Sequence, residues 1–283
     1  MLMQKIYYQG QKGAYSYVAA KYLFPKATLV GKDAFYKAFA APEKSTSALA
    51  VLPVDNTVIG SIFEVYDLLF NHSDLKIVGE VMLKIDHNLL AKRGTGISDI
   101  RKVYSHTKAL DQCRDLFKKY KNLEPVIYED TAGAARFVAG SRRKDIAAIA
   151  GKSAASVYGL EIIKPHVQSN GENYTRFVVL ANKVYKNTKA KNNSYKTSIV
   201  FAAAHKPGSL LSCMKPFSDS GFNLTKIESR PLLGKPWQYL FYLDFEHEGT
   251  NGEIKKVLKE VKPHTQILRI LGTYPKGETI SEA

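Results

Sequence analysis

The chain has 283 residues, of which 45% are hydrophobic and 24% charged, a composition typical of a globular protein and not of a disordered one. Its formal net charge of +15 is compatible with a nucleic-acid partner, an acidic small molecule or only a solvated basic surface. The sequence has no run of about 20 apolar residues that could cross a membrane and no export signal at its start. We therefore expect a cytoplasmic protein that does not contact a membrane.

Up to about residue 181, strand patterns alternate with helix patterns. Five times a strand pattern ends in a short polar or glycine turn, and a helix pattern follows at once. The strand patterns span residues 5–8, 47–54, 102–106, 125–130 and 145–150, and the helix patterns span 14–23, 62–70, 107–120, 131–139 and 151–160. This α/β order predicts a sheet with covering helices. Because ligands of such sheets bind beyond the carboxyl ends of strands, near helix N-termini that favour anions, the junctions predict an anion pocket.

A Lys/Asn-rich segment at 183–196 lacks apolar periodicity and marks the best domain boundary. After it the patterns change their order to strand, helix, strand, strand, helix, strand. They span residues 196–204, 208–221, 223–232, 237–246, 252–261 and 266–274. This is the ferredoxin-like βαββαβ order, found more often in binding and pairing domains than in catalytic ones. Cys113 and Cys213 fall in separate domains, so we expect reduced, packed thiols.

Several familiar sites are disfavoured by the sequence. Residues 150–153 (AGKS) resemble the end of a phosphate-binding loop, but Ile146 occupies the position of its leading glycine. The segment GQKGAYS at 10–16 lacks the third glycine of a dinucleotide fingerprint. The seven histidines are scattered without ligand spacing, and there is no G-x-S-x-G turn. We therefore expect neither metal nor nucleotide cofactor.

Polar residues remain at the ends of strand patterns. Asn56 follows one strand and precedes a helix, which is also the ordinary place for a turn-forming Asn. Ser105 is expected to cap the helix at 107–120, and Gln112 lies toward the apolar side of that helix. Thr131 is expected to cap the next helix. Each of these residues therefore has an ordinary structural interpretation that the sequence leaves open.

The segment GENYTRFVVLA at 171–181 places a hydroxyl, a guanidinium and an aromatic ring at the start of a strand predicted at 177–181. These side chains belong to Thr175, Arg176 and Phe177. On a strand, Thr175 and Phe177 point to one face and Arg176 to the other. Alternation therefore favours a structural role for Arg176, although a role in binding a carboxylate stays open.

Five fragments of the first part resemble the prephenate dehydratases in their order and approximate spacing. They are GQKGAYS, LPVDNTVIGS, YSHTKALDQC, EDTAGAA and GENYTRF. The second part, with PGSLL, NLTKIESRP and LGTYP, resembles the ACT regulatory domain that follows the catalytic part in that family. The resemblance covers essentially the whole chain, and the combination of TRF with NLTKIESRP is more specific than any single fragment.

The chain departs from the family pattern in three places. Asp55-Asn56-Thr57 stands where the family usually has Glu-Asn-Ser, Gln11 replaces a Pro, and Ser105-His106-Thr107 replaces Ser-His-Pro. These changes affect the pose of the first and third loops.

The resemblance implies a fold and a domain plan. We expect an α/β catalytic domain at 1–184, whose two lobes (about 1–80 with 166–184, and 81–165) resemble type II periplasmic-binding-protein folds. A linker at 185–195 and a βαββαβ ACT domain at 196–283 would follow. Because the chain opens directly on the first strand, we expect no chorismate mutase domain before it.

The resemblance also implies a reaction. Prephenate would lose carbon dioxide and water to give phenylpyruvate, without a cofactor and without a metal. The catalytic residues implied are Thr175 as proton or hydrogen-bond donor, with Asn56, Ser105 and Gln112. The residues implied to bind the substrate are Gly13, Ser16, Thr57, Thr131, Arg176 and Phe177.

The ACT resemblance implies regulation by phenylalanine and a homodimer or homotetramer formed through ACT domains. The effector residues implied are Gly208, Ser209, Leu210, Asn223, Glu228, Ser229 and Arg230. The nearest rival function is arogenate dehydratase, which performs the same chemistry on the amino analogue. A non-catalytic anion-binding module and a basic RNA-binding protein are rivals from other classes, although no RNA-reading pattern is visible.

Overall fold

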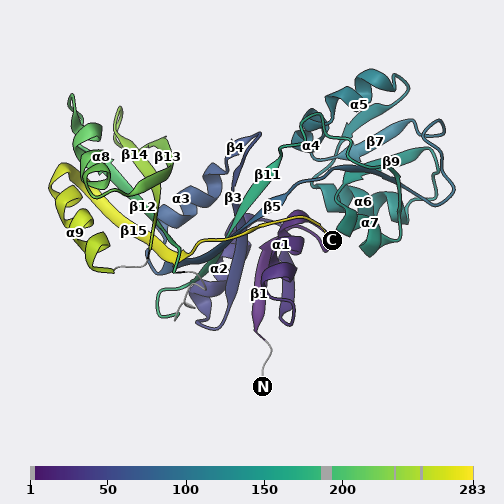
Figure 1. The fold of residues 1–283 in the computed structure, drawn as a ribbon. Coiled ribbons are helices and arrows are strands. Elements are labelled where there is room, and N and C mark those ends of the chain that lie inside the picture. The colour runs from purple at the N-terminus through teal and green to yellow at the C-terminus, as the bar shows by residue number, and fades with distance from the viewer. Residues whose placement is uncertain (1–3, 186–192, 233, 249–250, 283) are drawn as a thin grey trace. The chain divides into compact units, whose positions relative to one another are not determined.

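The computed structural model describes residues 4–185, 193–232, 234–248 and 251–282 (Figure 1). Contacts divide the chain into two compact units, each assembled from separate segments. Unit 1 comprises Met1–Val65, Val81–Val178 and Glu278–Ala283, and unit 2 comprises Tyr66–Glu80 and Val179–Gly277. Most of the predicted linker, residues 186–192, lies outside the described residues, so the predicted domain boundaries stay predictions.

The first sheet belongs mainly to unit 1 and runs in the order β16-β5-β11-β3-β1-β2, with β4 paired to β3. Strand β1 pairs in parallel with both β2 and β3, and β3 is an apolar run that is buried along almost its whole length, as expected for a parallel strand covered on both faces. Its strands are β1 (Lys5–Gln9), β2 (Thr28–Lys32), β3 (Leu49–Asn56), β4 (Gly60–Ser61), β5 (Leu75–Lys84), β11 (Tyr174–Asn182) and β16 (Thr279–Ile280). The helices that follow its first three long strands are α1 (Tyr15–Leu23), α2 (Phe35–Lys44) and α3 (Phe63–Asn71).

The second sheet of unit 1 runs in the order β10-β6-β9-β7-β8. Its central strand β9 is buried at every position, and separate apolar clusters lie on its two faces. The strands are β6 (Asn88–Ala91), β7 (Lys102–Ser105), β8 (Glu124–Ile127), β9 (Ile146–Ala150) and β10 (Glu161–Lys164). The helices are α4 (Thr107–Gln112), α5 (Arg114–Lys119), α6 (Thr131–Gly140) and α7 (Lys152–Tyr158). The predicted α/β alternation is therefore present in unit 1.

The helix predicted at 107–120 is two short helices. The chain leaves helical geometry at Cys113, which has φ −108° and ψ 26° and donates its N–H to Leu110. The thiol of Cys113 is completely buried in the apolar cluster, and burial raises its pKa to about 12. The prediction of one continuous helix was wrong at Cys113, because its N–H bonds the carbonyl three residues back instead of the one four residues back.

Two predicted helix caps are also wrong by one position. The N-cap of α4 is His106, whose ring accepts from the N–H of Lys108, and not Ser105. The N-cap of α6 is Asp130, whose carboxylate accepts from the N–H of Gly133 at 2.7 Å, and not Thr131. Carboxylates are favoured at helix N-termini because of the unpaired N–H groups there.

Unit 2 contains the predicted strand, helix, strand, strand, helix, strand order. The elements are β12 (Tyr195–Ala203), α8 (Ser209–Asp219), β13 (Asn223–Pro231), β14 (Tyr239–His247), α9 (Asn251–Val261), the short 3-10 helix η1 (Lys262–His264) and β15 (Thr265–Pro275). The sheet order is β13-β14-β12-β15, with antiparallel pairs throughout. Helices α8 and α9 lie on the same side of this sheet (Figure 1) and pack on it through residues such as Phe201, Phe217 and Phe245.

Segment 66–80 contacts the sheet of unit 2 through buried polar groups. The Tyr242 hydroxyl donates to the carbonyl of Tyr66 at 3.0 Å. The ammonium of Lys196 lies 2.9 Å from the carboxylate of Glu80, and both side chains are almost completely buried. These contacts explain why segment 66–80 belongs to unit 2 although it is distant in sequence.

Both cysteines are free and buried, as the sequence predicted. Among the described residues, no helix combines the length and the apolar character needed to cross a membrane.

Candidate functional site

A cleft with a volume of about 360 Å³ lies in unit 1. Its walls come from the loop after β1, the end of β3, the segment after β5, helix α4, the start of α6 and the first residues of β11. The polar side chains that line the cleft include Tyr15, Asn56, His87, Gln112, Thr131 and Thr175, and the apolar ones include Phe35, Ile59, Ile62, Ile85 and Phe177. The strand ends therefore converge on one cleft, as the sequence predicted.

Asn56, at the end of β3, uses all of its hydrogen-bonding capacity. Its Oδ1 accepts from the backbone N–H groups of Val58 at 2.9 Å and Ile59 at 3.0 Å. Its Nδ2 donates to Oδ1 of Asn173 at 2.7 Å and to Oγ1 of Thr175 at 2.9 Å. Because β3 and β11 are neighbours in the sheet, the turn after one strand fixes side chains at the start of the other.

The network continues from Asn173 to Gln112 and His87. Nδ2 of Asn173 donates to Oε1 of Gln112 at 3.0 Å, and Nε2 of His87 lies 2.8 Å from the same oxygen. Nδ1 of His87 lies 2.9 Å from the Tyr15 hydroxyl, which is also 2.9 Å from the carbonyl of Asp86. Burial lowers the pKa of His87 to about 4, and hydrogen bonding to Gln112 only partly opposes this. The imidazole is therefore neutral near pH 7.

Thr175 has a hydroxyl hydrogen to give. Its oxygen accepts from Asn56, and this is the hydrogen bond that its side chain makes among the described residues. Phe177, two residues along β11, lines the same cleft, as strand alternation predicted. The geometry thus offers a fixed hydroxyl donor beside an aromatic wall.

Six of the predicted site residues line the cleft and four do not. The six are Ser16, Asn56, Gln112, Thr131, Thr175 and Phe177. Of the other four, Gly13 has φ +90°, and an added Cβ would lie 2.9 Å from the Cα of Ala154. Glycine at position 13 therefore permits a close contact between the first loop and α7.

Ser105 is completely buried, and its hydroxyl donates to the carbonyl of Ile149 at 2.6 Å. This bond ties β7 to the neighbouring strand β9 and satisfies a buried hydroxyl. Its catalytic role stays a prediction that this geometry does not favour.

Arg176 and Thr57 are engaged in contacts away from the cleft. Nη1 of Arg176 lies 3.3 Å from the carboxylate of Asp55, and the Arg176 side chain is largely buried. The Thr57 hydroxyl donates to the carbonyl of Glu172 and accepts from the N–H of Tyr174, both at 2.9 Å. The Thr57 bonds hold the loop before β11, whereas the Arg176–Asp55 contact joins β11 to β3. The substrate-binding roles of both residues stay predictions.

Sequence reasoning missed Tyr15, His87 and Asn173. Tyr15 and Asn173 lie inside the fragments GQKGAYS and GENYTRF. The family resemblance depends on these fragments, but nothing in the sequence singled out these two residues within them. His87 had no signal, because its partners are 25 and 72 positions away in the chain.

The charges around the cleft are mixed. Lys108 lines it from the first turn of α4, and Glu129 and Asp130 line it at the start of α6. Asp130 already accepts a hydrogen bond as the cap of α6. Lys108 is the one Lys or Arg among the residues described as lining the cleft, so it is the cation placed to meet an anion. Within the described residues, no group of three or more His, Cys, Asp or Glu could hold a metal ion.

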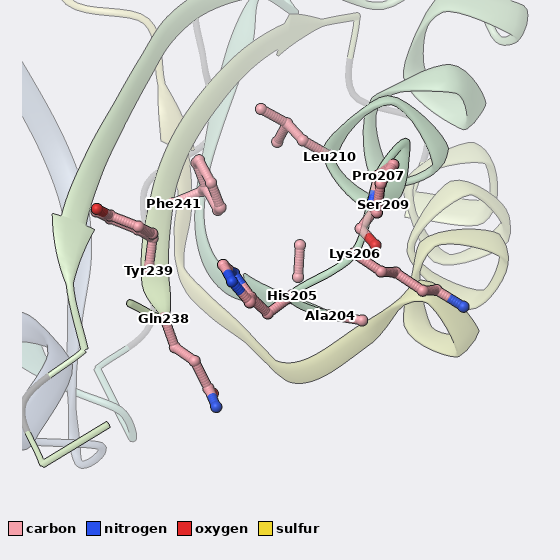
Figure 2. Close-up of a pocket in the computed structure, with 10 residues that line it drawn as sticks. Ala204, His205, Lys206, Pro207, Ser209, Leu210, Gln238, Tyr239 and Phe241 are labelled. Carbon is pink, nitrogen blue, oxygen red and sulfur yellow. The ribbon is translucent and has the colours of Figure 1, made fainter. Parts of the chain in front are cut away.

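Unit 2 has a pocket of about 310 Å³ beside the start of α8 (Figure 2). Ser209 and Leu210 line it with His205, Lys206, Gln238 and Phe241, and Gly208 precedes α8 with φ +79°. Among the described residues, the buried atoms Ser209 Oγ and Gln238 Oε1 have no hydrogen-bond partner.

The other four predicted effector residues, Asn223, Glu228, Ser229 and Arg230, lie on β13 and do not line this pocket. Arg230 instead contacts Asp67 at 2.6 Å. The predicted effector residues therefore fall into two groups within unit 2.

Comparison with known proteins identifies a family. The sequence profile described as "Prephenate dehydratase" matches residues 6–185. A relative from Arabidopsis thaliana, "Arogenate dehydratase/prephenate dehydratase 2, chloroplastic", is 40% identical over 285 residues, which span 98% of this chain and 74% of the relative.

Two solved structures are also similar. A prephenate dehydratase from Arthrobacter aurescens in complex with L-Phe has a TM-score of 0.86 and 25% identity, covering 96% of this chain and 89% of that one. GqqA, described as a novel type of quorum-quenching acylase, has a TM-score of 0.85 and 30% identity, covering 96% of this chain and 98% of that one.

Proposed function

Because this chain belongs to the prephenate dehydratase family, a family of lyases, we propose that it converts prephenate into phenylpyruvate for phenylalanine biosynthesis. The ring carboxylate leaves as carbon dioxide, and the electrons of that C–C bond form the new ring double bond. The C4–oxygen bond breaks with its electron pair on oxygen, which takes a proton and leaves as water. The aromatic product supplies the driving force, so the protein has to orient a dianion and help a hydroxyl depart.

Thr175 is the proposed donor to the departing hydroxyl. The observation that carries this assignment is the 2.9 Å bond from Asn56 to Thr175 Oγ1, which occupies an acceptor site of the threonine and leaves its O–H for the cleft. A threonine hydroxyl is a weak acid in water, so we assign it as a hydrogen-bond donor to the departing oxygen, and the proton that completes the leaving water comes from solvent.

Lys108 and Gln112 are proposed to hold the carboxylates of the substrate. Lys108 supplies the positive charge at the cleft. Gln112 accepts two hydrogen bonds on Oε1, so its NH₂ group keeps both hydrogens for an anion. Ser16 and Thr131 also line the cleft and contribute hydroxyls.

An assay with two substrates tests the proposed function. Purified protein is incubated with prephenate and, in parallel, with arogenate, and phenylpyruvate and phenylalanine are quantified. Turnover of prephenate supports the proposal, and turnover of arogenate alone would replace it with the amino analogue. Saturable binding of either compound without turnover would identify an anion-binding module instead.

We also propose that residues 196–283 form an ACT regulatory domain that binds phenylalanine. The βαββαβ order of unit 2 and the pocket at Ser209 and Leu210 support this assignment, as does the L-Phe complex of the similar Arthrobacter aurescens enzyme. Paired ACT domains would make the protein a homodimer or homotetramer. The two sheets of unit 1 would correspond to the lobes of a periplasmic-binding-like fold, and we propose a cytoplasmic enzyme. Calorimetric titration with phenylalanine, and sedimentation with and without it, test effector binding and assembly.

A further inference from the structure

The hydrogen-bond network beside the cleft has only one consistent set of donors and acceptors. Backbone N–H groups can only donate, and two of them, from Val58 and Ile59, point to the same atom of Asn56. That atom must be the amide oxygen, so the nitrogen of Asn56 faces Asn173 and Thr175. The orientation of the first amide is therefore fixed by the backbone and not by a choice between two amide poses.

The same logic fixes each following group. The atom of Asn173 that faces the Asn56 nitrogen must be its oxygen, so its nitrogen donates to Gln112. The atom of Gln112 that receives this bond must be its oxygen, and His87 Nε2 lies 2.8 Å from that oxygen. An oxygen without hydrogens cannot donate, so His87 must carry a hydrogen on Nε2.

We propose that His87 is a positioning residue, whose Nε2–H group holds the carbonyl oxygen of Gln112 and so turns the Gln112 NH₂ group toward the substrate. The proposal rests on the proposed function for its substrate, but its hydrogen-bond assignment does not. His87 lines the cleft but is only 3% exposed, and both of its ring nitrogens contact protein groups, so we assign its effect to the orientation of Gln112.

The other ring nitrogen completes the assignment. A neutral imidazole with hydrogen on Nε2 has a lone pair on Nδ1, which accepts from the Tyr15 hydroxyl at 2.9 Å. Tyr15 also donates to the Asp86 carbonyl at 2.9 Å, so its single hydrogen is shared between two acceptors. The ring of His87 is thus contacted by Tyr15 at Nδ1 and by Gln112 at Nε2.

Two variants of His87 distinguish loss of the hydrogen-bond donor from loss of the volume of the ring. His87→Gln places an amide nitrogen near the position of Nε2 and keeps a donor for Gln112, whereas His87→Asn reaches only the position of Nδ1. We expect His87→Gln to keep kcat within about threefold of wild type and His87→Asn to lower it roughly 10- to 100-fold, the loss expected for a misplaced donor. His247→Asn, which removes a half-buried imidazole in unit 2, is the control and should leave kcat unchanged.

A double-mutant cycle distinguishes positioning from a general loss of packing. In a Gln112→Ala background there is no amide to orient, so His87→Asn should lower kcat by less than about threefold. The same fold loss in both backgrounds would overturn the proposal.

A measurement without turnover keeps the hydrogen-bond assignment independent of the substrate. ¹⁵N NMR of histidine-labelled wild-type protein, with the His87 signals assigned by their loss in His87→Gln, should show Nε2 protonated and Nδ1 unprotonated at pH 7. A hydrogen on Nδ1 alone, or on both nitrogens, would overturn the proposal even if His87→Asn fails to fold. If wild-type protein turns over neither prephenate nor arogenate, the proposed function fails while the NMR result stands.

Discussion

The two units treat their buried polar groups differently. Beside the cleft of unit 1, neutral side chains form a continuous network in which Asn56, Asn173 and His87 leave no buried net charge. In unit 2, a charged pair between Lys196 and Glu80 is buried almost completely. Neutral amides orient one another without opposing the charge of an incoming dianion, whereas a buried ion pair mainly fixes the packing of the segments it joins. Substitutions in the network should therefore change turnover first, and substitutions of the pair should change stability first.

The largest effect is expected at Thr175. Thr175→Ala removes the proposed donor and should lower kcat by roughly 10²–10⁴, the usual contribution of a positioned proton donor. Thr175→Ser keeps the hydroxyl and should retain most of the activity. Steady-state assays combined with melting curves separate this loss from unfolding, and near-wild-type turnover by Thr175→Ala would remove the residue from the mechanism.

The next effect is on the stability of unit 2. Lys196→Met leaves the Glu80 carboxylate buried without its cation and should lower the free energy of unfolding by about 3–5 kcal/mol. The matched control is Lys215→Met, because the pair of Lys215 with Asp219 is exposed and should contribute less than about 1 kcal/mol. Denaturant unfolding measures both, and equal effects would contradict the importance of burial.

A pH effect should follow from His87 in unit 1. Burial lowers its pKa from 6.5 to about 4, so between these values the unfolded chain takes up a proton that the folded protein does not. Stability should therefore fall as pH drops from about 6.5 to 4, by at most about 3 kcal/mol. The groups that face the ring are Tyr15, Gln112 and Asp86. His87→Gln should abolish this slope in urea unfolding measured at several pH values, and an unchanged slope would contradict it.

Glu282 would mask part of that slope, because its effect has the opposite sign. Burial raises its pKa from 4.5 to about 7, against the opposing bonds from the N–H groups of Lys152 and Ser153. The folded protein therefore holds a proton that the unfolded chain releases, and stability is lost as pH rises from about 4.5 to 7. Measuring the His87 slope in a Glu282→Gln background removes this contribution, and the slope should become steeper.

The smallest effect is expected in the pocket of unit 2. Ser209→Ala removes one buried hydroxyl and should weaken phenylalanine binding by roughly tenfold or less, the contribution of one hydrogen bond, with kcat unchanged when phenylalanine is absent. Calorimetric titration checks this value. No heat of binding for the wild-type protein at millimolar phenylalanine would contradict the regulatory proposal itself.

Local patterns were sufficient to predict most of the fold. The five predicted strand–helix junctions are present in unit 1, and the βαββαβ order of unit 2 was evident from alternating patterns. Strands β2, β5, β6 and β10 and helix α2 were not predicted. The break at Cys113 was not predictable, because residues 107–120 contain neither Gly nor Pro to mark it. The caps at His106 and Asp130 were missed by one residue, since neighbouring polar residues compete for the same N–H groups.

The candidate site was only partly predictable for a related reason. Thr175, Asn56 and Gln112 stood at element ends in recognisable fragments, and they line the cleft. Ser105 stood in a similar place, but it is a buried residue of β7 and its hydroxyl donates to Ile149 inside the sheet. His87 acquires its role only through contacts with side chains far away in the chain, which no local pattern records.

The most direct test of the account is a crystal structure of the Thr175→Ala variant with prephenate bound. The C4 hydroxyl should lie about 3 Å from the position that the Thr175 hydroxyl occupies in the wild-type protein, with the Gln112 NH₂ group facing the substrate. A C4 hydroxyl directed away from position 175 would contradict it.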